Sequence, residues 1–141
     1  MNERKKKRYD NLYMDIAKRV GEMSYDVDTK VGAVIVKDGN IISMGWNGTP
    51  SGFDNSCKSP TTGATLRTVI HAEANAICKL AKSSTNGEGA TLYCTMSPCI
   101  ECAKLILQSG ISHVVVGRMY EKDMEGFKIL NEKINIKVLA K

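Results

Sequence analysis

The sequence predicts an α/β protein with three layers, in which helices cover both faces of a five-stranded mixed sheet. Segments typical of strands and of helices follow one another in the order α-β-β-α-β-α-β-α-β. The strand–helix–strand units in this order are typical of parallel crossovers. The chain has 141 residues, of which 43% are hydrophobic. This length favours one domain over residues 1–141.

A helix and a hairpin are expected in the first third of the chain. Apolar residues at helical spacing predict an amphipathic helix whose apolar face holds Tyr9, Leu12, Tyr13, Ile16, Ala17 and Val20. The basic run Arg4–Arg8 before them is expected to be a solvated end. The β-branched run Val31–Val36, the turn Asp38-Gly39 and the apolar segment Ile41–Trp46 predict two antiparallel strands.

The rest of the chain alternates between the two kinds of element. Residues 47–67 are rich in Gly, Ser, Thr, Pro and Asn, which predicts a long loop. Strong helix formers predict a helix over 72–81. Further strands are expected at 90–95, 113–117 and 134–139, and further helices at about 99–109 and 124–133.

Composition excludes several classes of protein. No apolar run approaches the roughly 18 residues of a membrane span, and the segment 9–23 carries charges where a signal peptide would be apolar. The cysteine count of five is odd, and two of them form Cys99-x-x-Cys102. We therefore expect a reduced, cytoplasmic protein. The net charge of +5 suits an anionic ligand without indicating a polynucleotide partner.

Two short motifs carry the candidate chemistry. His71 precedes the second helix, and Cys99 and Cys102 lie near the start of the third, where Ser97 is the expected N-cap and Pro98 the first helical residue. Residues three apart share one side of a helix, and the positive end of the helix favours thiolates. This set of nitrogen and sulfur donors predicts a zinc site.

Three protein ligands leave one position of a tetrahedral zinc site for water, which is typical of a catalytic site. Zinc lowers the pKa of its water, and Glu73, beside His71, is the expected proton acceptor and donor. The arrangement favours hydrolysis.

The paired motif is the signature of zinc nucleobase deaminases, and the match extends over about residues 31–126. Four segments carry it: Val31–Val36, Gly45–Phe53, His71–Ile77 and Ser97–Lys104. Together they resemble the deoxycytidylate (dCMP) deaminase family, particularly its phage-type members.

The resemblance implies a cytidine deaminase-like fold and zinc-dependent hydrolysis of dCMP to dUMP and ammonia, which supplies dUMP for thymidylate synthesis. It also implies one catalytic Zn²⁺ per chain. The implied roles are metal binding by His71, Cys99 and Cys102, proton transfer by Glu73, base binding by the backbone of Ala72 and Ser97, sugar contact by Asn47, and base contact by Tyr120.

The same resemblance implies a homohexamer activated by dCTP, with Mg²⁺ as its companion ion, and inhibited by dTTP. Gly45-Trp46-Asn47-Gly48 matches the family's regulatory loop, so Asn47 and Gly48 are candidates for regulation, substrate binding or both. The implied partners are small nucleotides, with neither a polynucleotide nor a membrane. Because the long loop offers Cys57 alone, no second zinc site is expected.

Two other functions are compatible with the motifs. A tRNA adenosine deaminase belongs to the same superfamily, but its members usually carry Glu where this chain has Ser97. A non-catalytic zinc module would bind nucleic acid or protein through Arg4–Arg8, but no fourth Cys or His accompanies the trio. Candidates for holding a 5′-phosphate are Ser24, Tyr25, Lys30 and the long loop.

Overall fold

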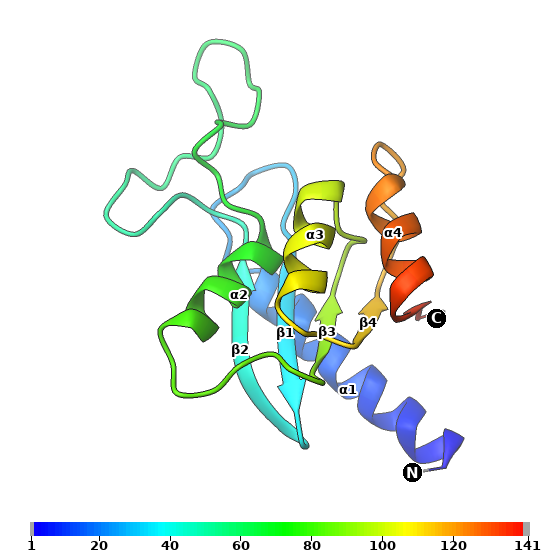
Figure 1. Ribbon diagram of the computed structural model, residues 1–141. Helices are drawn as coiled ribbons and strands as arrows, with labels where there is room; N and C mark the ends of the chain where they lie inside the picture. Colours follow the sequence, from blue (N-terminus) through cyan, green and yellow to red (C-terminus); the bar gives the residue numbers. More distant parts are fainter. Residues whose placement is uncertain (1, 140–141) are drawn as a thin grey trace.

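The computed structural model describes residues 2–139 as a sheet with one helix on one face and three helices on the other (Figure 1). In chain order the elements are α1 (Glu3–Gly21), β1 (Gly32–Lys37), β2 (Asn40–Trp46), α2 (Ala72–Ala81), β3 (Thr91–Cys94), α3 (Ile100–Gln108), β4 (His113–Val116), α4 (Glu125–Lys133) and β5 (Asn135–Val138). The predicted order of elements and the predicted fold class are confirmed.

The strands lie in the order β2-β1-β3-β4-β5. β1 runs antiparallel to both of its neighbours, whereas β3, β4 and β5 are parallel, so the sheet is mixed as expected. Asp38 and Gly39 both have positive φ, at 51° and 76°. A two-residue turn of this kind matches the twist of the strands that it joins, which explains the β1–β2 hairpin.

The hydrophobic core lies on both faces of the sheet. On one face, Ile35, Leu92 and Val114 pack with side chains from the three helices α2, α3 and α4. On the other face, Val34, Val36 and Val115 pack with side chains from α1. Alternate residues of β1 therefore serve opposite layers, as the period of a strand requires.

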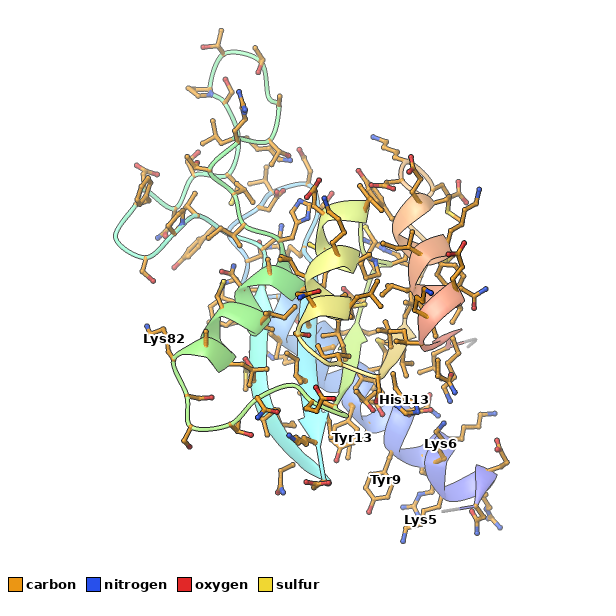
Figure 2. The ribbon with its side chains drawn as sticks, viewed as in Figure 1. Lys5, Lys6, Tyr9, Tyr13, Lys82 and His113 are labelled. Atoms are coloured by element: carbon orange, nitrogen blue, oxygen red, sulfur yellow. The ribbon has the colours of Figure 1, made fainter. Side chains whose placement is uncertain are left out.

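Helix α1 departs from the sequence prediction in two ways. It begins at Glu3, so the basic run Arg4–Arg8 forms its first turns instead of preceding it. Tyr9 and Leu12, expected on the buried face, are 40% and 48% exposed. Tyr9 stacks on Tyr13 one turn further along the helix (Figure 2), with ring centroids 6.1 Å apart. The apolar pattern of α1 therefore extends further toward its N-terminus than the part of the helix that packs on the sheet.

A buried carboxylate, Asp10, joins α1 to the sheet. Its side chain is 3% exposed. The hydroxyl of Tyr93 on β3 donates a hydrogen bond of 2.7 Å to Asp10 Oδ1, and the ammonium of Lys137 on the edge strand β5 forms an ion pair with Oδ2. Burial, followed by the bond to Asp10, raises the pKa of Tyr93. The phenol therefore remains a donor, and Asp10 links three elements.

Removing the Tyr93 hydroxyl should destabilise the protein without altering its packing. We expect Tyr93→Phe to lower the free energy of unfolding by about 1–3 kcal/mol, because it removes a hydrogen bond from a buried charged group. Urea denaturation followed by circular dichroism measures the change. Tyr9→Phe is the matched control, since that ring is 40% exposed, and equal losses in the two variants would contradict the role given to Asp10.

Candidate active site

The first half of the site is the start of α2, which lies against the end of β2. A Cβ atom on Gly45 would lie 2.5 Å from the carbonyl oxygen of Ala72, so this close approach requires glycine. Asn75 Nδ2 donates to the carbonyl of Trp46 at 2.8 Å, and the Ser43 hydroxyl donates to the carbonyl of Ala76 at 2.7 Å. The helix is thereby fixed with His71 as its N-cap residue.

The second half is the start of α3, and here one sequence prediction is wrong. The N-cap residue is Cys99, not Ser97, and the helix begins at Ile100. The Ser97 hydroxyl is used elsewhere, since its oxygen accepts a hydrogen bond of 2.6 Å from the backbone N–H of Tyr120. A distant residue, Asp123, accepts from the N–H of Ile100 at 3.0 Å and so satisfies the first turn.

The two helix starts bring three metal-binding side chains together. His71 Nδ1 lies 3.4 Å from the sulfur of Cys99 and 3.4 Å from the sulfur of Cys102. For a tetrahedral zinc ion, bonds of about 2.3 Å to sulfur and 2.0–2.1 Å to nitrogen place the donor atoms roughly 3.5 Å apart. The three donors, all within 4.8 Å of one another, therefore fit zinc.

Without a metal, hydrogen bonds within the trio divide its protons unevenly. Hydrogen bonds from Cys102 and His71 lower the pKa of Cys99 to about 4, and the bond with Cys99 raises the pKa of His71. The hydrogen bond between Cys102 and Cys99, followed by burial, raises the pKa of Cys102. One thiolate is thus already present and the neighbouring thiol keeps its proton. Binding a metal releases such protons.

Glu73, on the first turn of α2, is the buried acid of the site. It is 4% exposed, and burial raises its pKa to about 7. It lies outside the group of three metal-binding residues but lines the same cavity as His71 and Cys99. A carboxyl group with a pKa near neutrality is suited to accept and return a proton.

A cavity of about 380 Å³ extends from these residues to the surface. Such a volume is typical of a site for a small molecule. Four residues predicted to bind substrate line it: Asn47, Ala72, Ser97 and Tyr120.

The Asn47 side chain has structural bonds at both ends of its amide. Its Oδ1 accepts from the N–H of Val31 at 2.9 Å, and its Nδ2 donates to the carbonyl of Thr29 at 2.9 Å. Gly48 does not line the cavity. It pairs with Ile70 through two backbone hydrogen bonds of 3.0 and 2.7 Å, which close the base of the long loop.

Sequence reasoning named the long loop, which supplies Lys58 and Thr65 to the cavity, but it did not single out the charged residues that line the cavity. Asp26, Asp28, Lys58 and Lys122 line it, and all four lie in loops. No spacing pattern marks them, because loops have no period. The three named candidates for a phosphate site, Ser24, Tyr25 and Lys30, do not line this cavity.

Other parts of the described chain add no metal site. Across residues 2–139 the trio is the one group of His, Cys, Asp and Glu side chains that fits a metal ion. Cys57, the sole cysteine of the long loop, has no such partners there. His113 is exposed and bonds to Ser112 at 2.8 Å.

Comparison with known proteins agrees with this geometry. Residues 7–118 match the family described as the cytidine and deoxycytidylate deaminase zinc-binding region. The chain belongs to this family. The deaminase resemblance carried by the sequence motifs is thereby confirmed, and the His–Cys–Cys group is its zinc-binding candidate.

Phage and yeast proteins are among the relatives of this chain in sequence. The deoxycytidylate deaminase of Enterobacteria phage T4 is 34% identical over an alignment covering 89% of this chain and 86% of the phage protein. The deoxycytidylate deaminase of Saccharomyces cerevisiae is 36% identical, and the alignment covers 86% of this chain but 41% of the yeast protein. The chain thus spans less than half of that longer relative.

A solved structure has nearly the same fold. The dCMP deaminase of the cyanophage S-TIM5, crystallised with dCMP and dUMP, superposes with a TM-score of 0.89 and is 38% identical, covering 98% of both chains. The cytidine deaminase-like fold class is therefore confirmed. No helix within residues 2–139 is both long and apolar enough to cross a membrane.

Loss of one donor should remove the metal. We expect His71→Ala to bind zinc at least tenfold more weakly than the parent protein, because two thiols then remain of the trio. Competition with a chromogenic chelator measures the affinity. Cys78→Ser, at an exposed cysteine on α2, is the matched control. Unchanged zinc affinity in His71→Ala would contradict its role as a ligand.

Proposed function

We propose that this protein hydrolyses dCMP to dUMP and ammonia with one zinc ion per chain. The observation that carries the proposal is the group of His71, Cys99 and Cys102, two of which, His71 and Cys99, line a nucleotide-sized cavity together with the buried Glu73. The names of the phage and yeast relatives, and the cyanophage enzyme crystallised with dCMP and dUMP, support the choice of substrate.

The three metal-binding residues would hold zinc beside the cavity that His71 and Cys99 line. When bound there, zinc lowers the pKa of a water molecule so that it can attack C4 of the cytosine ring. Glu73 accepts a proton from this water and delivers protons to the base, so that the C4–N bond breaks and ammonia leaves. Its pKa of about 7 allows transfer in both directions.

Other cavity residues would orient the nucleotide. Ala72, Ser97 and Tyr120 all line the cavity, so the backbone groups of Ala72 and Ser97 would bind the polar edge of the base and the Tyr120 ring would lie beside it. The Ser97–Tyr120 hydrogen bond fixes these two residues relative to each other. Asn47 has a second amide N–H beyond the one bonded to Thr29, and this group would contact the sugar.

The proposal includes regulation and assembly. Following the family resemblance, we infer a cytoplasmic homohexamer that dCTP with Mg²⁺ activates and dTTP inhibits, with Asn47 and Gly48 in the regulatory loop. Gly48 lies at the closed base of that loop, directly after Asn47, so a nucleotide bound there would be adjacent to the catalytic cavity. We treat residues 1–141 as one deaminase domain.

Ammonia release from a set of substrates tests the proposed function. The zinc-loaded protein is assayed with dCMP, CMP, deoxycytidine, dCTP and an adenosine-bearing tRNA anticodon stem. We expect selective turnover of dCMP. Turnover of the tRNA stem alone would instead assign the protein to the adenosine deaminases, and inactivity on all five would favour the zinc-module alternative.

A parallel series tests regulation. The dCMP reaction is repeated with dCTP and Mg²⁺, and then with dTTP, while sedimentation velocity measures the oligomeric state. We expect dCTP to raise the rate at low dCMP concentration and dTTP to lower it. Rates that neither effector changes would contradict the regulatory part of the proposal and leave the catalytic part intact.

Replacing the proposed proton carrier should separate chemistry from metal binding. We expect Glu73→Gln to keep one zinc per chain and to lower kcat on dCMP by a factor of about 10²–10⁴, because the amide cannot accept the proton. Zinc content and initial rates are measured on the same preparation. Full activity in this variant would refute the assignment. Glu101→Gln, at an exposed residue of the first turn of α3, is the matched control.

A further inference from the structure

We propose that Lys122 recognises the phosphate of the substrate and so selects nucleotides over nucleosides. The inference rests on the proposed deaminase function and deepens it, because it assigns a role to a charged residue that lines the cavity. The cavity is lined by His71, Cys99 and Glu73 and also by loop residues with charged side chains, namely Asp26, Asp28, Lys58 and Lys122.

Two lysines, Lys58 and Lys122, line the cavity, and Lys58 already has partners. Lys58 Nζ lies 3.4 Å from a carboxylate oxygen of Asp26 and 3.6 Å from one of Asp28, and it donates to the hydroxyl of Thr65 at 2.7 Å. Its side chain is 19% exposed. The charge of Lys58 is therefore neutralised by Asp26 and Asp28, and these ion pairs hold the long loop against the segment between α1 and β1.

Asp26 is itself fixed as an anion. Its carboxylate accepts from the backbone N–H groups of Asp28 and Thr29 at 2.8 and 3.0 Å. Although burial opposes it, these bonds and Lys58 hold the pKa of Asp26 below its ordinary value. A substrate phosphate that displaced Lys58 would leave this buried carboxylate unpaired, which is costly. Lys58 is for this reason a poor phosphate ligand.

Lys122 differs from Lys58 in having no such partner. It is exposed, and within residues 2–139 no carboxylate lies within 4.0 Å of its ammonium group. It lines the cavity two residues after Tyr120. A phosphate monoester carries nearly two negative charges at neutral pH, and an ammonium group without a counter-ion is suited to bind it.

The backbone around Lys122 is tied to the metal-binding helix. On one side, Tyr120 is bonded to the Ser97 hydroxyl at 2.6 Å. On the other side, the Asp123 carboxylate accepts from the N–H of Ile100 at 3.0 Å and from the N–H of Glu125 at 3.1 Å. The chain that carries Lys122 is thus held against the residues flanking Cys99. The backbone of Lys122 is therefore held in place beside the residues that flank the metal site.

Steady-state kinetics on dCMP and deoxycytidine test the proposal. We expect Lys122→Ala to raise KM for dCMP by about 10-fold or more with little change in kcat, because a charge-assisted bond is lost. Turnover of deoxycytidine, which has no phosphate, is expected to stay unchanged. Lys122→Arg should restore most of the affinity for dCMP.

Lys82→Ala is the matched control. Lys82 is exposed at the far end of α2 (Figure 2), about 15 Å along the helix axis from its first residue. We expect its kinetics to equal those of the parent protein. Lys58→Met serves as the second variant, which loosens the loop without removing Lys122.

Binding measurements keep the proposal testable independently of turnover. Calorimetry compares dUMP with deoxyuridine on the zinc-loaded protein, and the preference for dUMP is expected to fall about 10-fold in Lys122→Ala. An unchanged preference in Lys122→Ala, or a preference lost in Lys58→Met instead, would overturn the assignment. If the parent protein does not turn over dCMP, the proposed function is contradicted. The role of Lys122 in phosphate binding is still supported if the parent prefers dUMP and Lys122→Ala loses that preference.

Discussion

The site depends on the meeting of two helix starts at one end of the sheet. Cys99 and Cys102 lie 28 and 31 residues beyond His71 in the sequence, and yet their sulfurs are both 3.4 Å from its Nδ1. Zinc tolerates little variation in these distances. The backbones that carry the donors must therefore be held closely, and much of the surrounding structure does this.

Glycine permits the close contact on each side of the pair. Gly45 lets β2 touch the first turn of α2, and a Cβ on Gly126 at the start of α4 would lie 2.2 Å from the carbonyl oxygen of Pro98. One helix is thereby pressed against a strand and the other against α4. Because Pro98 directly precedes Cys99, the packing of α4 fixes a metal-binding residue that it does not itself contain.

The sequence was sufficient for the elements and for the trio, because both have a pattern. Strand and helix periods located nine elements in the right order, and the spacing of His71, Cys99 and Cys102 marked a metal site. Prediction failed where a distant residue decides the outcome. Ser97 has the chemistry of an N-cap, but Tyr120 takes its hydroxyl and Asp123 caps the helix instead.

The same explanation covers the other errors. Tyr9 and Leu12 fit an apolar helical face, yet α1 extends past the sheet there and leaves them 40% and 48% exposed. The cavity residues Lys58 and Lys122 lie in loops, where identity alone gives no position. The exposure of Tyr9 and Leu12 and the positions of the two lysines both depend on contacts between segments that are far apart in the sequence. Patterns within a single sequence do not reveal such contacts.

The long loop is attached in a way that separates its conformation from the geometry of the metal site. Gly48 and Ile70 are bonded to each other at its base, so the residues between them leave and rejoin the body at one point. Asn47 and His71 flank this closure directly. The Asn47 amide bonds to Thr29 and Val31, and His71 begins α2. A change of loop conformation beyond this closure would move Lys58 and break its ion pairs with Asp26 and Asp28, whereas His71 would stay fixed at the start of α2.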